Sequence, residues 1–295
     1  MNGFFLAAID RWVGAKPYTP DVSGLTTRPA VVVTGGSSGI GLAIAQEFRR
    51  QGETVVLVAR DESRLTAARS SFEPSERIHI ISLDITALDA PALLDAALRD
   101  LNLSLDVLVN SAGTGLAGLF DIHSPEEIDR LIALNVSALT RLTRQALPAM
   151  KARGRGGILN IASLGGYIPG PNQAAYYASK AYVCSLSEAL ASELAGTGVR
   201  MTVAAPGPIE TKFHARMGAD NALYRTILPA LSPARAARSA VFAYRLNRSV
   251  VVPGLIYKAM AVAVTIIPHW LTLPFIKIIL APRPANSNNG IKNTR

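Results

Sequence analysis

Cysteine is almost absent from the sequence, with Cys184 the single example among 295 residues. One thiol cannot form an internal disulfide bond, so we exclude a disulfide-stabilised secreted domain and expect a reducing compartment. We expect Cys184 to be a small, buried, apolar residue. The four histidines, His79, His123, His214 and His269, lack the close spacing of metal ligands. The sequence therefore predicts no metal site.

Long apolar runs are also missing. The richest stretch, residues 255–281, is interrupted by lysines, a histidine and two prolines, Pro268 and Pro274. No run reaches the roughly 18 apolar residues that a membrane-spanning helix needs. The N-terminal apolar run is short and has no basic lead, which makes it a poor secretory signal. We therefore expect cytoplasmic residence.

Acidic residues are scarce toward the C-terminus. Residues 212–295 contain 12 Lys and Arg but one acid, Asp220, so this part carries the excess positive charge of a chain whose net charge is +9. A one-ended basic surface favours an anionic partner, although an ordinary solvated face explains it equally well. Because no nucleic-acid-reading motif or interleaved aromatic residues accompany the charge, we expect a membrane surface rather than nucleic acid to be the candidate partner.

Short β-branched runs alternate with helix-period segments from Ala30 onward. The runs are apolar on both sides of the pleat, as in strands that are covered on both faces. This alternation predicts an α/β fold with a doubly wound parallel sheet of about seven strands, a Rossmann fold. The expected strands are 30–34, 54–59, 78–83, 106–109, 157–162, 201–205 and 249–252. The expected helices are 39–51, 62–71, 91–101, 125–152, 174–196 and 233–245.

Hydrophobic residues make up 49% of the sequence, enough for one large core. We predict an N-terminal arm over residues 1–29 and a dinucleotide-binding and catalytic domain over residues 30–254. An apolar, basic, helical extension with a flexible tail is expected over residues 255–295.

A glycine-rich turn directly follows the first expected strand and opens a helix. Gly35, Gly39 and Gly41 let the backbone approach a pyrophosphate, and the free N–H groups of the helix N-terminus attract its charge. The spacing is Gly-x-x-x-Gly-x-Gly, which differs from the more general Gly-x-Gly-x-x-Gly pattern. The placement of this turn predicts a dinucleotide site.

The tip of the second expected strand reads Val58-Ala59-Arg60. A carboxylate at this point would bind a free ribose 2′-hydroxyl, whereas the guanidinium of Arg60 suits a 2′-phosphate. We therefore expect NADP. Asp61 and Glu62 follow at once, so NAD becomes the better choice if the strand ends one or two residues later.

Tyr176 and Lys180 have the spacing Tyr-x-x-x-Lys, which places them one turn apart on the same face of an expected helix. Ser163 lies just past the fifth expected strand, at the carboxyl edge where doubly wound folds bind ligands. Reduction of a ketone needs a proton donor for the developing alkoxide. We expect Tyr176 to supply the proton, Lys180 to lower the pKa of its phenol, and Ser163 to hydrogen-bond the oxyanion.

These motifs together resemble the short-chain dehydrogenase/reductase family, over roughly Ala30 to Val252. The segment 34–41 is similar to the family's Thr-Gly-x-x-x-Gly-x-Gly loop, and 110–113 to its Asn-Asn-Ala-Gly turn, from which Ser111 departs. The resemblance implies that Asp84 lies near the adenine ring and that Asn135 holds a proton-relay water behind the lysine.

The same resemblance extends to the segment 206–211, similar to a Pro-Gly-x-x-x-Thr motif whose Ile209 and Thr211 would hold the nicotinamide carboxamide. The expected catalytic residues are Asn135, Ser163, Tyr176 and Lys180. The expected cofactor contacts are Gly35, Ser37, Ser38, Gly39, Ile40, Gly41, Arg60, Asp84, Ile85, Asn110, Ala112, Gly113, Tyr176, Lys180, Pro206, Gly207, Ile209 and Thr211.

The substrate is less well encoded. The loop 164–173 is apolar and rich in glycine, which favours an apolar ketone or alcohol of lipid, steroid or acyl type. An apolar lid is one interpretation of the segment after Thr211, and an ordinary packed helix is the other. The candidate lid residues are Phe213, Met217, Leu223, Tyr224 and Ile227. His214 lies near the expected pocket, where it either contacts the substrate or only packs.

The predicted function is therefore NADP-dependent hydride transfer between nicotinamide and an apolar secondary alcohol or ketone, with a homo-oligomer as the expected assembly. The alternative is a nucleotide-sensing or scaffold protein that keeps the fold without turnover. Two interpretations of residues 255–281 stay open. They either lie in the interface of the inner face of a membrane or cover the substrate pocket or a dimer partner. In the first case Trp270 and Tyr257 suit the depth of the interface, and Lys258, Lys277 and Arg283 would meet anionic headgroups.

Overall fold

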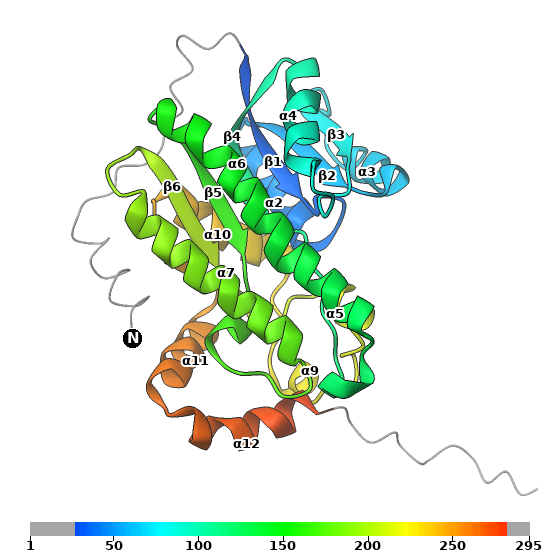
Figure 1. The fold of residues 1–295 in the computed structure, drawn as a ribbon, viewed down its shortest axis with the longest axis vertical. Coiled ribbons are helices and arrows are strands. Elements are labelled where there is room, and N and C mark those ends of the chain that lie inside the picture. Colours follow the sequence, from blue (N-terminus) through cyan, green and yellow to red (C-terminus); the bar gives the residue numbers. More distant parts are fainter. Residues whose placement is uncertain (1–26, 282–295) are drawn as a thin grey trace, which may run out of the picture.

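A computed structural model describes residues 27–281, so most of the predicted N-terminal arm and the predicted tail lie outside the described residues. Figure 1 shows a twisted sheet of parallel strands in the order β3-β2-β1-β4-β5-β6-β7. The doubly wound seven-stranded sheet is therefore confirmed. Its strands are β1 (Arg28–Thr34), β2 (Thr54–Ala59), β3 (Ile78–Ser82), β4 (Leu103–Asn110), β5 (Gly156–Ile161), β6 (Val199–Ala204) and β7 (Val250–Val251).

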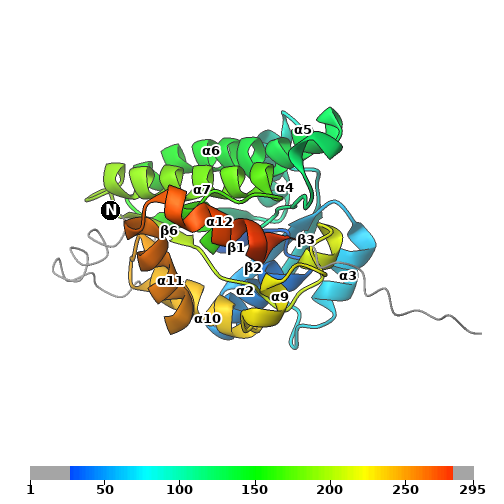
Figure 2. The same ribbon diagram turned by 90° about the horizontal axis from the view of Figure 1, so that it is seen from below.

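Helices cover both faces of the sheet, as Figure 2 shows from below. One face carries α2 (Gly39–Arg50), α3 (Glu62–Arg69) and α10 (Pro233–Arg245), and the other carries α4 (Ala90–Asp100), α6 (Leu139–Ala152) and α7 (Ala174–Glu193). Along β1, Val31 and Val33 pack in the first layer while Ala30 and Val32 pack in the second. This explains why the strands are apolar at every position rather than at alternate ones.

The helix predicted over residues 125–152 has a different internal structure. It begins as α5 (Pro125–Ile132), passes through a π-helical segment η2 (Ala133–Ala138) and continues as α6. A single wide turn of this kind is common at functional sites because it changes the direction of the side chains it carries. Here the π-helical segment contains Asn135, whose side chain is buried.

Apart from β2, the strands differ from their predicted bounds by one to three residues at one or both ends. β4 begins at Leu103, three residues before the predicted start, and β7 consists of Val250 and Val251 alone. Among the described strands, β7 lies at an edge of the sheet and pairs with β6 alone. Short edge strands expose few unpaired backbone groups, which limits unwanted pairing with other chains.

The predicted C-terminal extension is present as α11 (Leu255–Ile266) and α12 (His269–Leu280), with Pro268 between them. In Figures 1 and 2 the two helices lie across the end of the sheet at which the strands finish. Tyr257 and Ala261 anchor α11 in the core beside Val252. Among the described helices, none is both long and apolar enough to cross a membrane.

Candidate active site

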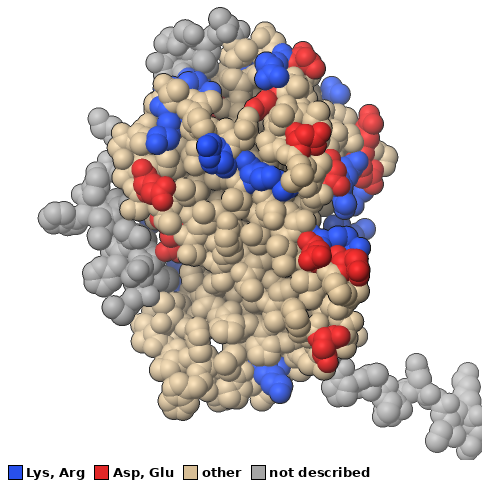
Figure 3. Space-filling model, in the orientation of Figure 1, with Lys and Arg blue, Asp and Glu red and all other residues tan. Residues whose placement is uncertain are grey.

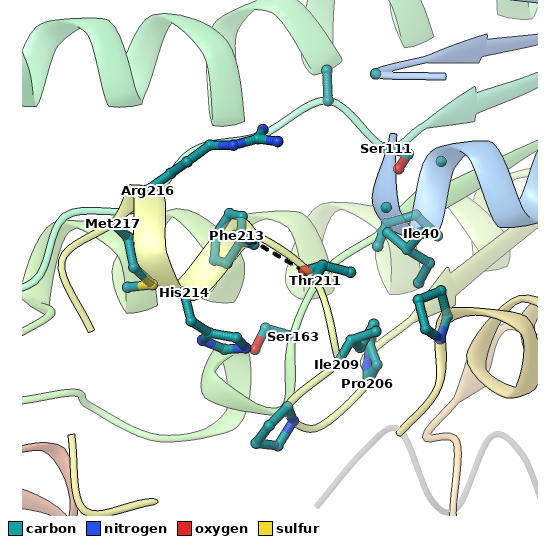
Figure 4. Close-up of a pocket in the computed structure, with 18 of the residues that line it drawn as sticks. Ile40, Ser111, Ser163, Pro206, Ile209, Thr211, Phe213, His214, Arg216 and Met217 are labelled. Atoms are coloured by element: carbon teal, nitrogen blue, oxygen red, sulfur yellow. Dashed lines mark hydrogen bonds between the residues drawn. The ribbon is translucent and has the colours of Figure 1, made fainter. Parts of the chain in front are cut away.

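A cavity of about 900 Å³ lies along the carboxyl edge of the sheet. Residues just after five strands contribute to its wall, namely Gly35, Arg60, Ser111, Ala162 and Pro206. In a parallel sheet with helices on both faces, this edge is the usual ligand site because the loops there diverge. Figure 4 shows part of the cavity, with Ile40 and Ser111 at one end and His214 and Met217 at the other.

The glycine turn gives the nucleotide half of the cavity its close backbone packing. Gly35 has φ +66°, and a Cβ there would lie 2.9 Å from the Cα of Ala112. A Cβ on Gly41 would lie 2.5 Å from the carbonyl oxygen of Gly35. Larger residues at these two positions would therefore push the turn and the helix apart.

The N-terminus of α2 is free to bind an anion. Its N-cap residue, Ser38, makes no side-chain capping bond, and the first turn holds no acidic residue. The unpaired N–H groups and the positive end of the helix dipole point into the cavity wall that Ser37, Ser38 and Gly39 form. These features fit the pyrophosphate of a dinucleotide.

The far end of the nucleotide half is basic. β2 ends at Ala59 as predicted, and both Arg60 and Arg64 line the cavity. Asp61 is instead the N-cap of α3, where its carboxylate accepts a hydrogen bond from the backbone N–H of Arg64 at 3.0 Å. Asp61, whose carboxylate would favour NAD if it lay at the end of β2, thus caps α3 instead.

Asp84 faces this basic end across the crevice, with its carboxylate 3.9 Å from the guanidinium of Arg60. Hydrogen bonds from Thr86, with the hydroxyl contributing most, hold the pKa of Asp84 below its usual value. Arg60 is 74% exposed, so its contact with Asp84 is loose and leaves the guanidinium available.

Tyr176 and Lys180 lie one turn apart on α7, and Ser163 lies at the end of β5, where it caps the short helix η3 (Leu164–Tyr167). All three side chains line the cavity. The ammonium of Lys180 donates a hydrogen bond of 3.0 Å to the carbonyl of Ile161 and lies 5.8 Å from the centre of the Tyr176 ring. The structure therefore brings the three predicted chemical groups together.

Burial dominates the protonation of these groups. It raises the pKa of Tyr176 above its ordinary value, and a hydrogen bond with Ser163 opposes the rise. Burial also lowers the pKa of Lys180 to about 8. The lowering of the Tyr176 pKa by Lys180 stays a prediction: here the ammonium is directed at Ile161, and desolvation of the phenolate has the largest effect on that pKa.

Asn135 lies behind the catalytic group rather than in the cavity wall. Its Nδ2 donates to the Thr114 carbonyl (2.8 Å) and to the Ser179 hydroxyl (3.0 Å), while its Oδ1 accepts from the Thr114 N–H (2.9 Å). It thereby ties the loop after β4 to α7, next to Lys180. A Cβ on Gly113 would lie 3.3 Å from Asn135 Oδ1 and 3.5 Å from Lys180 Nζ, so the three groups are closely packed.

Asn110 is likewise outside the cavity. Its side chain is 3% exposed and donates to the Asn160 side chain at 2.9 Å and to the Thr143 hydroxyl at 3.2 Å. These bonds of its side chain support the loop after β4 from beneath. Of the expected site residues, the following line the cavity: Gly35, Ser37, Ser38, Gly39, Ile40, Gly41, Arg60, Asp84, Ile85, Ala112, Gly113, Ser163, Tyr176, Lys180, Pro206, Gly207, Ile209 and Thr211.

The segment 206–211 crosses between the two halves of the cavity. A Cβ on Gly207 would lie 2.4 Å from the ring of Tyr257, so α11 packs directly against this segment. Thr211 approaches the glycine turn, since its Cγ2 lies 3.4 Å from a Cβ built on Gly39. Its hydroxyl accepts a hydrogen bond from the N–H of Phe213 at 3.3 Å, the dashed line in Figure 4.

The substrate half is mostly apolar. Three of the five candidate lid residues, Phe213, Met217 and Tyr224, line it, whereas Leu223 and Ile227 do not. Sequence reasoning did not name several further apolar residues of this wall, among them Leu228, Met260 of α11, and Ile276, Ile279 and Leu280 of α12. Gln173, the last residue of the predicted substrate loop 164–173, also lines the cavity.

The C-terminal helices thus cover the pocket, as one of the two open interpretations required. No local pattern places α12 against α7, because the contact joins residues about a hundred positions apart. Gln173 did carry a signal, since it precedes Tyr176 by three residues and so belongs to the same helical face. Within residues 27–281, no group of three or more His, Cys, Asp or Glu side chains is arranged to hold a metal ion.

Comparisons with known proteins agree with this geometry. The profile of the family described as short chain dehydrogenase matches residues 29–222. The sulfoacetaldehyde reductase of Chromohalobacter salexigens is 37% identical over 206 residues, covering 66% of this chain and 80% of the relative. A short-chain dehydrogenase from Sphingobium yanoikuyae, solved in complex with NADPH, is 32% identical, with a TM-score of 0.71 over 80% of this chain and 93% of that one.

A second similar structure is the bulky-bulky ketone specific alcohol dehydrogenase from Comamonas testosteroni, 29% identical, with a TM-score of 0.66 over 82% of this chain and 96% of that one. The family match spans the glycine turn, the Tyr-Lys pair and the segment 206–211. The chain belongs to the short-chain dehydrogenase/reductase family and is an NAD(P)-dependent oxidoreductase that acts on CH–OH groups.

Proposed function

We propose that this protein is an NADP-dependent oxidoreductase that interconverts apolar ketones and secondary alcohols. One observation carries the proposal: Ser163, Tyr176 and Lys180 meet in one cavity, between an anion-binding helix end and an apolar chamber. Bound NADPH supplies the hydride that reduces the carbonyl carbon. The remaining steps belong to the residues of the chain.

Tyr176 is the proton donor in the direction of reduction. Its raised pKa keeps the phenol protonated at neutral pH, so a proton is available when negative charge develops on the substrate oxygen. Ser163, hydrogen-bonded to the same phenol, stabilises that oxygen with its hydroxyl. The Lys180 ammonium adds positive charge behind Tyr176, and Asn135 positions the loop against which Lys180 packs.

The preference for NADP is supported by the basic end of the nucleotide half. Two guanidinium groups, Arg60 and Arg64, line the cavity where the adenine ribose would lie, and Asp61 caps α3. A 2′-phosphate would form charge-assisted hydrogen bonds there, whereas a 2′-hydroxyl gains much less. The similar Sphingobium protein was solved with NADPH, which agrees with this preference.

The preference for an apolar substrate is supported by the chamber beyond Tyr176. Leucine, isoleucine, methionine and aromatic side chains from several elements line it, among them Ile276, Ile279 and Leu280 of α12. A chamber of this kind binds apolar groups by removing them from water. The Comamonas relative is named for its specificity toward bulky ketones, and its likeness to this chain favours the same substrate class here.

The decisive experiment follows NADPH oxidation by absorbance with a panel of apolar ketones, in the wild-type protein and in Tyr176→Phe. Turnover that is lost in Tyr176→Phe while NADPH binding persists supports the enzyme. Tight NADPH binding without turnover of any ketone, in either direction, would instead favour the alternative of a nucleotide sensor or scaffold.

We further propose that the enzyme works as a cytoplasmic homo-oligomer that contacts the inner face of a membrane through the outer faces of α11 and α12. Only one side of α11 and one side of α12 line the cavity. On the other side, Trp270 is 73% exposed and Phe275 is 68% exposed. Other exposed apolar residues of the pair are Leu255, Ile256, Ile266, Ile267, Leu271 and Ile278. Figure 3 shows few charged side chains over this end of the molecule.

Charge favours a membrane over a second copy of the chain at this face. Neither α11 nor α12 contains an acidic residue, and each carries one lysine, Lys258 and Lys277. A symmetric dimer through the face would bring these like charges together, whereas anionic headgroups complement them. Exposed tryptophan between apolar and basic residues is typical of helices that lie in the interface.

A further inference from the structure

Three polar side chains interrupt the apolar half of the cavity. Gln173, His214 and Tyr224 are 3%, 8% and 6% exposed, and all three line the cavity. They come from three different segments, the start of α7, α8 (Phe213–Arg216) and α9 (Tyr224–Ile227). Buried polar groups are costly unless they are hydrogen-bonded, so each hydrogen-bonding atom needs a partner.

His214 and Tyr224 form an ordered pair. The Nδ1 atom of His214 lies 2.7 Å from the hydroxyl of Tyr224, and the imidazole also hydrogen-bonds the backbone of Ile209. Burial lowers the pKa of His214 to about 4, so the ring is neutral at neutral pH. A neutral ring that donates from Nε2 to a carbonyl has Nδ1 as an acceptor. Tyr224 then donates its proton to His214 and keeps its own oxygen free to accept.

Gln173 supplies the complementary group. It is the N-cap residue of α7, yet its side chain makes no capping bond to that helix. Its Nε2 is buried and has no hydrogen-bond partner among the described residues. The amide lies close enough to oppose the burial-driven rise in the pKa of Tyr224, but it does not complete a hydrogen bond with that residue. The cavity therefore presents an unused N–H donor near an oxygen that can accept.

We infer that Gln173 and Tyr224 form a binding site for a hydroxyl group of the substrate, separate from the oxygen that reacts at Tyr176. The substrate class is then a hydroxyketone and the corresponding diol, each with an apolar body. This inference rests on the proposed function, because it concerns the same cavity. His214 is a positioning residue, since it sets the direction of the Tyr224 proton.

Other polar groups match the site less well. A carboxylate or phosphate offers acceptors alone, which would accept from Gln173 but face the lone pairs of Tyr224. A second ketone group also offers acceptors alone, so it too would face the lone pairs of Tyr224. An ammonium donates to Tyr224 but meets the N–H of Gln173. A hydroxyl donates and accepts at once, so it pairs with both residues.

The test compares 2-decanone with a series of hydroxy-2-decanones that carry the hydroxyl on successive carbons, in the wild type, Gln173→Leu and Tyr224→Phe. At least one hydroxyketone should exceed 2-decanone in kcat/KM by about tenfold or more. Gln173→Leu should remove that advantage, because it should lower kcat/KM for the hydroxyketone about tenfold more than it lowers kcat/KM for 2-decanone. Gln145→Leu, which alters an exposed glutamine on α6 outside the cavity, should keep it.

A second measurement does not depend on turnover. The decanediol that corresponds to the preferred hydroxyketone should raise the melting temperature of the NADPH-bound wild type more than 2-decanol does, and Gln173→Leu should abolish the difference. If no hydroxyketone or diol is distinguished from its deoxy counterpart, or if Gln173→Leu lowers kcat/KM equally for both, the hydroxyl site is refuted. Loss of all turnover with the diol effect intact would instead overturn the proposed function alone.

Discussion

The ammonium of Lys180 hydrogen-bonds the carbonyl of Ile161, at the end of β5, and lies 5.8 Å from the centre of the Tyr176 ring. The two residues share one helical face, but the ammonium is fixed to the sheet rather than to the phenol. Tyr176 and Lys180 therefore have different roles. Tyr176 holds a proton because it is buried, and Lys180 contributes charge from a fixed position.

Replacing Tyr176 by phenylalanine removes the proton donor and little else. We expect turnover to fall by at least about a hundredfold, because general acid catalysis contributes that much or more. The dissociation constant for NADPH, measured by fluorescence titration, should stay nearly unchanged. Tyr177→Phe is the matched control, since Tyr177 packs edge-on against Tyr176 at 5.9 Å. A larger loss in Tyr177→Phe would show that the neighbouring ring performs the chemistry.

Arg60→Ala should weaken NADPH binding by about tenfold or more and leave NADH binding unchanged, because only the 2′-phosphate forms the charge-assisted contact. Ala59→Asp should shift the preference in the same direction by repelling the phosphate. Arg69→Ala removes an exposed arginine in the last turn of α3, outside the cavity, and should change neither affinity. Isothermal titration of both cofactors measures the effect. Equal affinities for NADPH and NADH in the wild type would contradict the assignment.

The pH dependence of ketone reduction should reflect Lys180. Its pKa is lowered to about 8, so the ammonium loses its charge as the pH rises through that value. We expect kcat/KM for reduction to be highest near neutral pH and to decline above about 8. Lys180→Arg keeps a charge throughout this range, so any activity it retains should not decline there. A wild-type profile that rises steadily to pH 10 is the opposite result.

His214 should make the fold sensitive to acid. Its pKa is lowered from 6.5 to about 4 in the folded protein, so the unfolded chain binds more protons between these values. The free energy of unfolding should therefore fall as the pH decreases from 6.5 toward 4, and this contribution should be absent above 6.5. Denaturant unfolding of the wild type and of His214→Gln, compared across this pH range, measures the contribution of His214 to the free energy of unfolding. If both proteins lose stability equally over this range, other groups cause the loss.

Contact with a membrane should depend on the outer face of α12. We expect the wild type to float with vesicles of phosphatidylcholine and phosphatidylglycerol, less so at high salt because the basic residues are screened. Phe275→Glu should reduce binding by about tenfold or more, since it places a charge on the buried side. Phe242→Glu alters a similarly exposed phenylalanine on α10 and should leave vesicle binding unchanged.

Two other results would exclude membrane contact. Failure of the wild type to float at low salt is the first. The second is a smaller oligomer in Phe275→Glu, measured by light scattering, which would identify the face as a contact between subunits.

The sequence was sufficient for the parts of this fold whose causes are local. Runs such as Val55 to Val58 must be covered on both faces, and the strand over 54–59 has the predicted bounds. The glycine turn and the Tyr-Lys pair were recognisable because their spacing is dictated by a helix end and a helical turn. The predicted residues that line the nucleotide half follow directly from these elements.

What escaped prediction depends on contacts between distant segments. The helix period over 125–152 does not reveal that Ala133–Ala138 is π-helical. Within this segment Asn135 bonds to Thr114 and Ser179, which are distant in the sequence. The approach of α12 to α7 depends on packing through the finished core. The apolar composition of residues 255–281 left open whether they lie in a membrane interface or cover the pocket or a dimer partner.

The floor of the substrate chamber is the last helix described. During synthesis from the N-terminus, all seven strands and the pyrophosphate-binding turn leave the ribosome before Ile276, Ile279 and Leu280 do. The nucleotide half can thus assemble while the substrate half is still open. Because the floor lies outside the sheet, evolution can also rebuild α12 to accept a different molecule without disturbing the residues that transfer the proton.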